Sequence, residues 1–128
     1  MEFKAAECFV GLEPDGDVFL FIASEQPDGD GRRIELQLAP EFDEQDAEVG
    51  MDTYCICLHG GETNYGGVAS WSFSQMLLEL RLSKDAAAVL GVESAAISID
   101  LSMFHSKRKM IEAGLKRILD SSKPGLTT

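Results

Sequence analysis

Apolar and polar residues alternate along several stretches of this chain, which is the pattern of a strand with one buried face. The alternation is clearest in residues 32–40, where Ile34, Leu36 and Leu38 are separated by charged or amide side chains. Other stretches are short runs of β-branched and aromatic residues, which are also enriched in strands. We therefore expect strands at residues 3–12, 18–24, 32–40, 51–59, 68–74, 76–82 and 95–101.

Clusters of Pro, Asp and Gly separate the first three of these strands. The segments EPDGD (residues 13–17) and QPDGDG (26–31) have the composition of turns, so the first two strands are predicted to form a hairpin. The segment GGETNYGG (60–67) predicts a wider hairpin turn, in which the glycines and Asn64 would take positive φ.

Two later segments change to a helical pattern. In SKDAAAVLG (83–91), Ser83 can cap the first turn, the alanines favour a helix and Gly91 can end it. After residue 102 the larger apolar residues recur at helical spacing, which predicts an amphipathic helix that ends near Leu119. The apolar positions of this helix are Phe104, Ile111, Leu115, Ile118 and Leu119.

Strands joined by short turns, with helices late in the chain, indicate an α+β fold. We expect a largely antiparallel sheet of about six to seven strands, with the short helix and the C-terminal helix packed on one face. The 128 residues fit a single domain, which we place at residues 1–120, followed by a flexible tail at 121–128.

The chain is strongly acidic, with 22 Asp and Glu against 11 Lys and Arg, a net charge of −11 and a pI near 4.4. Nucleic acids and anionic membranes are bound mainly through Lys and Arg, so we expect the chain to bind neither. The electrostatic field of this acidic chain would instead steer a basic protein toward it. The acids are densest in EFDEQDAE (41–48), which is either a solvated loop or a patch that docks a basic partner.

Three cysteines, Cys8, Cys55 and Cys57, cannot all pair within one chain. Cys55 and Cys57 are also poor partners for each other, because alternate residues of a strand lie near the upper Cα separation for a disulfide. We therefore expect all three thiols to be reduced, as they are in a cytosolic compartment. No segment has the pattern of a signal peptide or a membrane span. We therefore expect a cytoplasmic protein.

A strand would place Cys55, Cys57 and His59 on one face, where two sulfurs and a nitrogen could bind zinc. Structural zinc sites, however, usually have a fourth ligand. A cysteine could also act as a nucleophile with a histidine as its base, but no local sequence motif accompanies such a pair in this chain. The glycine-rich segment lacks the Lys and Ser or Thr of a P-loop, and the acidic segment lacks EF-hand spacing. We expect no cofactor, and keep a small metal-binding or enzymatic domain using these three residues as the alternative.

The stretch EFDEQDAEVGMDTY (41–54), followed by YGG (65–67), resembles the immunity protein 10 family of bacterial polymorphic toxin systems. The similarity continues through LLELRLSKDAAAVLGV (77–92). The resemblance implies a small α+β cytoplasmic protein, not an enzyme, that binds and neutralises a cognate toxin domain. We expect that toxin domain to be basic, with nucleases as one candidate class. The candidate partner-binding residues are Phe42, Asp43, Glu44, Asp46, Glu48, Asp52 and Tyr65.

Overall fold

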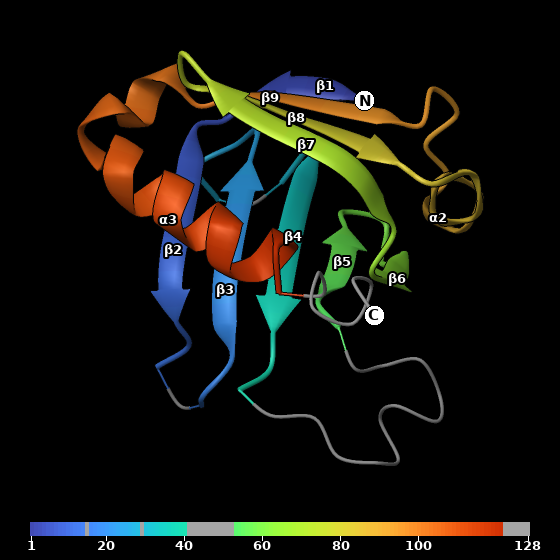
Figure 1. Ribbon diagram of the computed structural model, residues 1–128. Coiled ribbons are helices and arrows are strands. Elements are labelled where there is room, and N and C mark those ends of the chain that lie inside the picture. The colour runs from blue at the N-terminus through green and yellow to red at the C-terminus, as the bar shows by residue number, and fades with distance from the viewer. Residues whose placement is uncertain (15, 29, 41–52, 122–128) are drawn as a thin grey trace.

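The computed structural model describes residues 1–14, 16–28, 30–40 and 53–121, which form two β-sheets and their helices (Figure 1). The four-stranded sheet contains, in spatial order, β1 (Glu2–Lys4), β9 (Ala96–Asp100), β8 (Leu77–Leu82) and β7 (Val68–Ser74). The five-stranded sheet contains, in spatial order, β2 (Glu7–Leu12), β3 (Phe19–Ser24), β4 (Arg33–Leu38), β5 (Cys55–Leu58) and β6 (Thr63–Tyr65). Neighbouring strands are antiparallel except β1 and β9, which are parallel.

The α+β class predicted from the sequence is confirmed, and the described strands lie in two sheets instead of the single sheet that we expected. One reason lies within residues 3–12, which we expected to form a single strand. The backbone N–H of Ala5 donates to the Asp100 carbonyl at 2.9 Å, whereas that of Ala6 donates to the Ser24 carbonyl at 2.8 Å. The chain thus changes sheets between two alanines, whose small side chains fit at the corner.

The glycine-rich segment at 60–67 also differs from the expected wide hairpin turn. Strand β6 pairs with β5, and Asn64 lies inside β6 instead of at a positive φ. Gly66 and Gly67, with φ of 70° and 100°, then lead into β7 of the other sheet. The expected positive φ occurs at Gly61, Gly66 and Gly67, but the single wide turn was wrong, because a strand of three residues is too short to show an alternating pattern.

Tyr54 connects the two sheets next to these glycines. Its carbonyl oxygen accepts a hydrogen bond from the Gly66 N–H at 2.8 Å, and its hydroxyl oxygen accepts one from the Val68 N–H at 2.9 Å. The side chain is buried in the core. Tyr54 therefore fixes the start of β5 against the start of β7.

Both predicted helices are present. Helix α2 (Lys84–Leu90) begins after Ser83, whose hydroxyl oxygen accepts a backbone hydrogen bond of the first turn, and ends at the left-handed Gly91. The C-terminal segment begins as a 3₁₀ helix, η1 (Ser102–Lys107), and continues as α3 (Arg108–Leu119). The buried residues of α3 are Ile111, Gly114, Leu115, Ile118 and Leu119.

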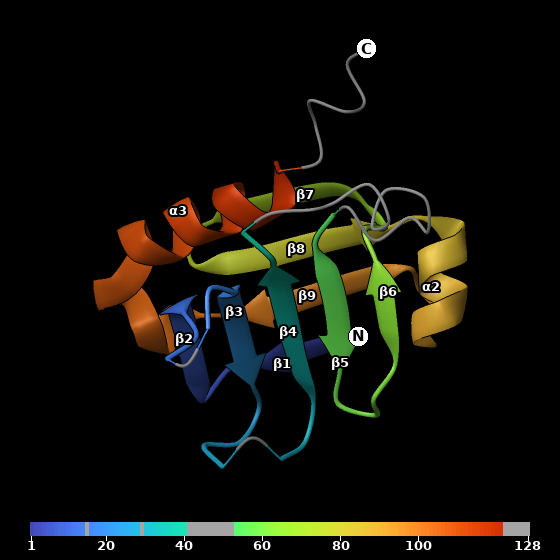
Figure 2. The ribbon, with the colours of Figure 1, turned by 90° about the horizontal axis from the view of Figure 1, so that it is seen from below.

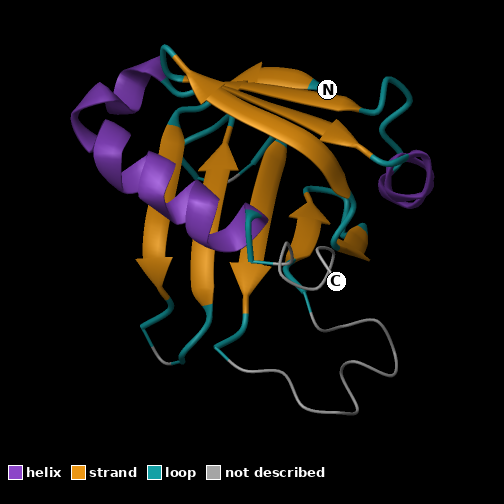
Figure 3. Cartoon of the chain, in the orientation of Figure 1, coloured by secondary structure: helices purple, strands orange, loops and turns teal. Residues whose placement is uncertain are grey.

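The core lies between the inner faces of the two sheets and α3. Figure 2 shows the strands of the five-stranded sheet running across those of the other sheet, and Figure 3 shows α3 lying across β2, β3 and β4. A Cβ atom added to Gly114 would come within 2.5 Å of Val10 Cγ1, so the helix approaches the sheet closely. Within the described part of the chain, no helix has the length and apolarity needed to cross a membrane.

Candidate partner-binding surface

Of the partner-binding residues predicted from the sequence, the structure places Tyr65. It lies at the end of β6 with 44% of its surface exposed. The others fall outside the described residues, as does the acidic segment that contains most of them; they are Phe42, Asp43, Glu44, Asp46, Glu48 and Asp52.

Tyr65 belongs to a face of the five-stranded sheet that points away from the core, which we call the outer face. Strand register places two rows of side chains across it. The first row is Phe9, Ile22, Glu35, Cys57 and Thr63. The second row is Gly11, Leu20, Gln37, Cys55 and Tyr65.

Aromatic side chains stand near both edges of this outer face. Phe9 on β2 is 41% exposed, Tyr65 on β6 is comparably exposed, and Ile22 between them is half-buried. Phe9 and Ile22 were not among the candidates predicted from the sequence. Their segments are apolar at almost every position, so the faces of these strands become distinguishable only through their register.

The centre of the outer face carries an ion pair instead of an excess of acid. Arg33 Nη2 lies 2.7 Å from Glu35 Oε1, and the two side chains are 32% and 17% exposed. The Gln37 side-chain amide donates to the other oxygen of the same carboxylate. Glu35 is therefore neutralised and held by its neighbours, so this part of the surface combines apolar groups with locally paired charges.

Cys55 and Cys57 lie side by side on the outer face, with their sulfurs 3.8 Å apart and not bonded. Burial, with Cys57 adding to the effect, raises the pKa of the Cys55 thiol to about 12. Burial likewise raises the pKa of Cys8 to about 11. Both thiols are protonated near neutral pH, which disfavours their use as nucleophiles because the thiolate is the reactive form.

His59 follows β5, and its Nδ1 atom accepts a hydrogen bond from the Arg33 backbone N–H at 3.4 Å. Among the described residues, no three His, Cys, Asp or Glu side chains are placed together to hold a metal ion. The zinc alternative built on Cys55, Cys57 and His59 therefore has no geometric support.

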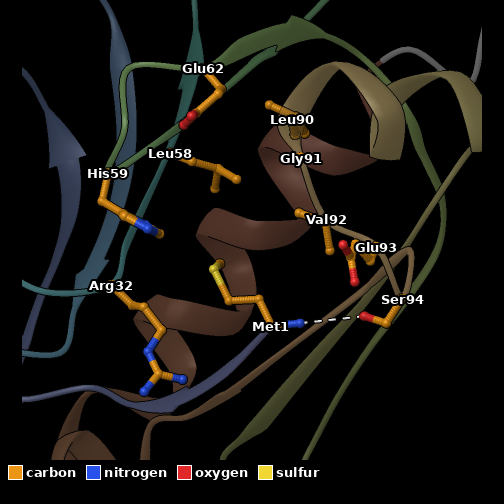
Figure 4. A pocket seen from close by; sticks show the side chains of 10 residues that line it. All are labelled: Met1, Arg32, Leu58, His59, Glu62, Leu90, Gly91, Val92, Glu93 and Ser94. Atoms are coloured by element: carbon orange, nitrogen blue, oxygen red, sulfur yellow. Dashed lines mark hydrogen bonds between the residues drawn. The ribbon is translucent and has the colours of Figure 1, made fainter.

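A pocket of about 540 Å³ lies between the end of β5 and the segment that follows α2 (Figure 4). Arg32, Glu62 and Glu93 contribute charges of both signs to its lining, together with apolar side chains such as Leu58. The one hydroxyl in the lining, that of Ser94, accepts a hydrogen bond from the Ala96 backbone N–H in the local turn. The same hydroxyl donates to the Ala96 carbonyl at 3.2 Å, so its proton is directed at the backbone and not at His59, the histidine in the lining. We assign no reaction to this pocket.

Comparison with known families identifies the chain's relatives. The sequence profile of the family described as Immunity protein 10 matches residues 4–109, from the last residue of β1 to the first turn of α3. Comparisons with curated proteins and with solved structures gave no match. Because the profile spans most of the sequence, the chain belongs to the immunity protein 10 family.

Proposed function

We propose that this protein binds a cognate bacterial toxin domain and neutralises it by covering the toxin's working surface. The observation that carries the proposal is the family match over residues 4–109, because immunity proteins have toxins as partners. An inhibitor of this kind needs a complementary surface and no catalytic residues. We infer that the protein acts by binding and not as an enzyme.

The outer face of the five-stranded sheet is the proposed contact surface. Large, rigid aromatic side chains carry much of the binding energy at protein interfaces, and this face presents Phe9 and Tyr65. Its second row also contains Gln37 and Cys55, which flank the acidic connection from β4 to β5 in the sequence. We therefore keep residues 41–52 in the proposed contact region.

Charge supports a basic toxin as the partner. The net charge of −11 would attract a positively charged domain and raise the rate of encounter. A nuclease is one such domain, because its active site must attract phosphate. Contact with the acidic segment would then place negative charge where the substrate's phosphates bind.

We further propose that the protein acts in the cytoplasm. Cys8, Cys55 and Cys57 are free thiols, and Cys55 and Cys57 lie close together without a bond. Free thiols persist in the reducing cytoplasm, which supports this location.

Co-expression with the toxin domain encoded immediately upstream tests the proposal. Cells that make both proteins should survive, and the two should elute as one complex. The double variant Phe9→Ser with Tyr65→Ser should protect poorly, because it removes two aromatic contacts from the outer face. A matched control, Leu77→Ser with Val89→Ser, removes two apolar side chains of similar exposure elsewhere and should protect as well as the wild type.

Two outcomes would count against this account in different ways. Cell death with the wild-type protein, together with no complex, contradicts the toxin-binding function. If cells survive with the Phe9 and Tyr65 variant and the complex has normal stability, the toxin does not bind through the outer face.

A further inference from the structure

The basic residues of this acidic chain are concentrated in one helical segment. The segment formed by η1 and α3 holds five of the chain's 11 Lys and Arg residues but only one of its 22 acids, Glu112. The rest of the sequence is correspondingly more acidic than the net charge of −11 suggests. The basic residues of this segment are Lys107, Arg108, Lys109, Lys116 and Arg117.

These five side chains are exposed and make no ion pair with a carboxylate of the described residues. On α3, the helical period places Lys109 and Lys116 on one line at the centre of the solvent-facing side, whereas Arg108 is the exposed first residue of the helix. Two of the five contact aromatic rings. The Arg117 guanidinium lies 4.1 Å from the centre of the Phe19 ring and helps to hold α3 on the sheet, and Lys107 Nζ lies 5.9 Å from the centre of the Phe104 ring.

Two exposed methionines accompany this charge. Met103 in η1 is 61% exposed and Met110 in α3 is 52% exposed, which makes them two of the most exposed large apolar residues described. Methionine is flexible and polarisable and is over-represented at binding surfaces. The segment therefore offers apolar contacts as well as charge. We call the surface formed by Met103, Lys107, Arg108, Lys109, Met110 and Lys116 the basic surface.

The position of two of these cations opposes the stability of α3, and a third lies next to them. Lys107 is the residue that precedes α3, and Arg108 and Lys109 occupy its first turn, where the helix dipole is positive. The turn contains no acidic residue and has no side-chain cap, so their mutual repulsion and the dipole act in the same unfavourable direction. The placement of Arg108 and Lys109 does not serve the stability of α3, although Lys107 also lies in the last turn of η1, where a cation is favourable. Local conflicts of this kind are expected at functional surfaces.

We propose that the basic surface docks an acidic surface of the toxin polypeptide, at a second contact separate from the outer face of the five-stranded sheet. This inference rests on the proposed function and names the charge that the toxin presents to α3. Charge complementarity supports it, because an acidic partner surface would relieve the repulsion among Lys107, Arg108 and Lys109.

Other anionic partners fit the molecule less well. Nucleic acid would meet the repulsion of a chain that is strongly acidic outside this segment. Insertion into a membrane surface requires a free apolar helix face, but Ile111, Leu115 and Ile118 are already fully buried against the sheets. An acidic protein surface can match both the cations and the methionines at short range.

Charge reversal of the basic surface tests the inference against purified toxin. The triple variant Lys107→Glu, Arg108→Glu, Lys109→Glu places acids at the N-terminal end of α3, which should keep this helix folded because they match its dipole. The control variant Lys4→Glu, Arg81→Glu, Lys84→Glu makes the same change in net charge at exposed cations outside the segment. The dissociation constant is measured for each at about 0.15 M salt, where distant charges are largely screened.

The expected result is a loss of affinity of about tenfold or more for the α3 variant, with a change of less than about threefold for the control. Affinity that is unchanged or higher in the α3 variant would overturn the inference. That result is expected if the toxin presents a basic surface to α3, or does not contact α3. Wild-type protein that does not bind the toxin would instead contradict the proposed function itself.

A DNA duplex and phosphatidylserine vesicles serve as parallel probes. Binding to either probe that the α3 variant loses, while its toxin affinity is unchanged, would also overturn the inference.

Discussion

Gly67 stands where the chain passes from one sheet to the other, at a point with no room for a side chain. Its φ is 100°, a region that favours glycine, and an added Cβ would lie 2.8 Å from Asn64 Nδ2 and closer still to Ala86 Cβ. The same backbone freedom occurs at Gly61, where φ is 89° but an added Cβ meets nothing within 4 Å. Comparing the same substitution at Gly67 and at Gly61 therefore separates the cost of backbone strain from the cost of steric crowding.

Replacing Gly67 by Ala should lower the free energy of unfolding more than replacing Gly61 by Ala. Both variants carry a backbone cost of about 1 kcal/mol, and the Gly67 variant adds overpacking against α2 of about 1–3 kcal/mol. Urea denaturation of the two variants and the wild type gives both values. Equal losses in the two variants would mean that α2 does not press against Gly67.

At the scale of elements, the sequence predicted those segments whose signals are local. Helix α2 lies between the predicted cap Ser83 and the predicted stop Gly91, and β7 has the predicted bounds of residues 68–74. Strand β6 was missed because three residues show no period, and the corner at Ala5 was missed because only pairing with distant strands reveals it.

The acidic segment at residues 41–48 is the element whose predicted role stays a prediction. If it steers a basic toxin, replacing Asp43, Glu44 and Asp46 by Lys should slow association by about tenfold or more, because opposed charges set the encounter rate. Stopped-flow measurements at low and at physiological salt would show this difference shrinking as salt rises. Association rates equal to those of the wild type at low salt would place the segment outside the contact.

At the scale of the whole molecule, surfaces were harder to predict than elements. Tyr65 was chosen from the sequence, but Phe9 and Ile22 join it on one face only through the register of five strands. The net charge predicted an acidic molecule and concealed the basic surface, because a sum over the chain does not show that α3 differs from the rest. Both candidate contacts depend on how distant segments are brought together.

Titration of the purified toxin domain with this protein tests the central claim most directly, since the claim is that binding alone neutralises the toxin. Toxin activity should fall in proportion to added protein and disappear near one equivalent, with no added cofactor and no change in the covalent structure of either chain. Full toxin activity in the presence of a several-fold excess of folded protein would contradict the account.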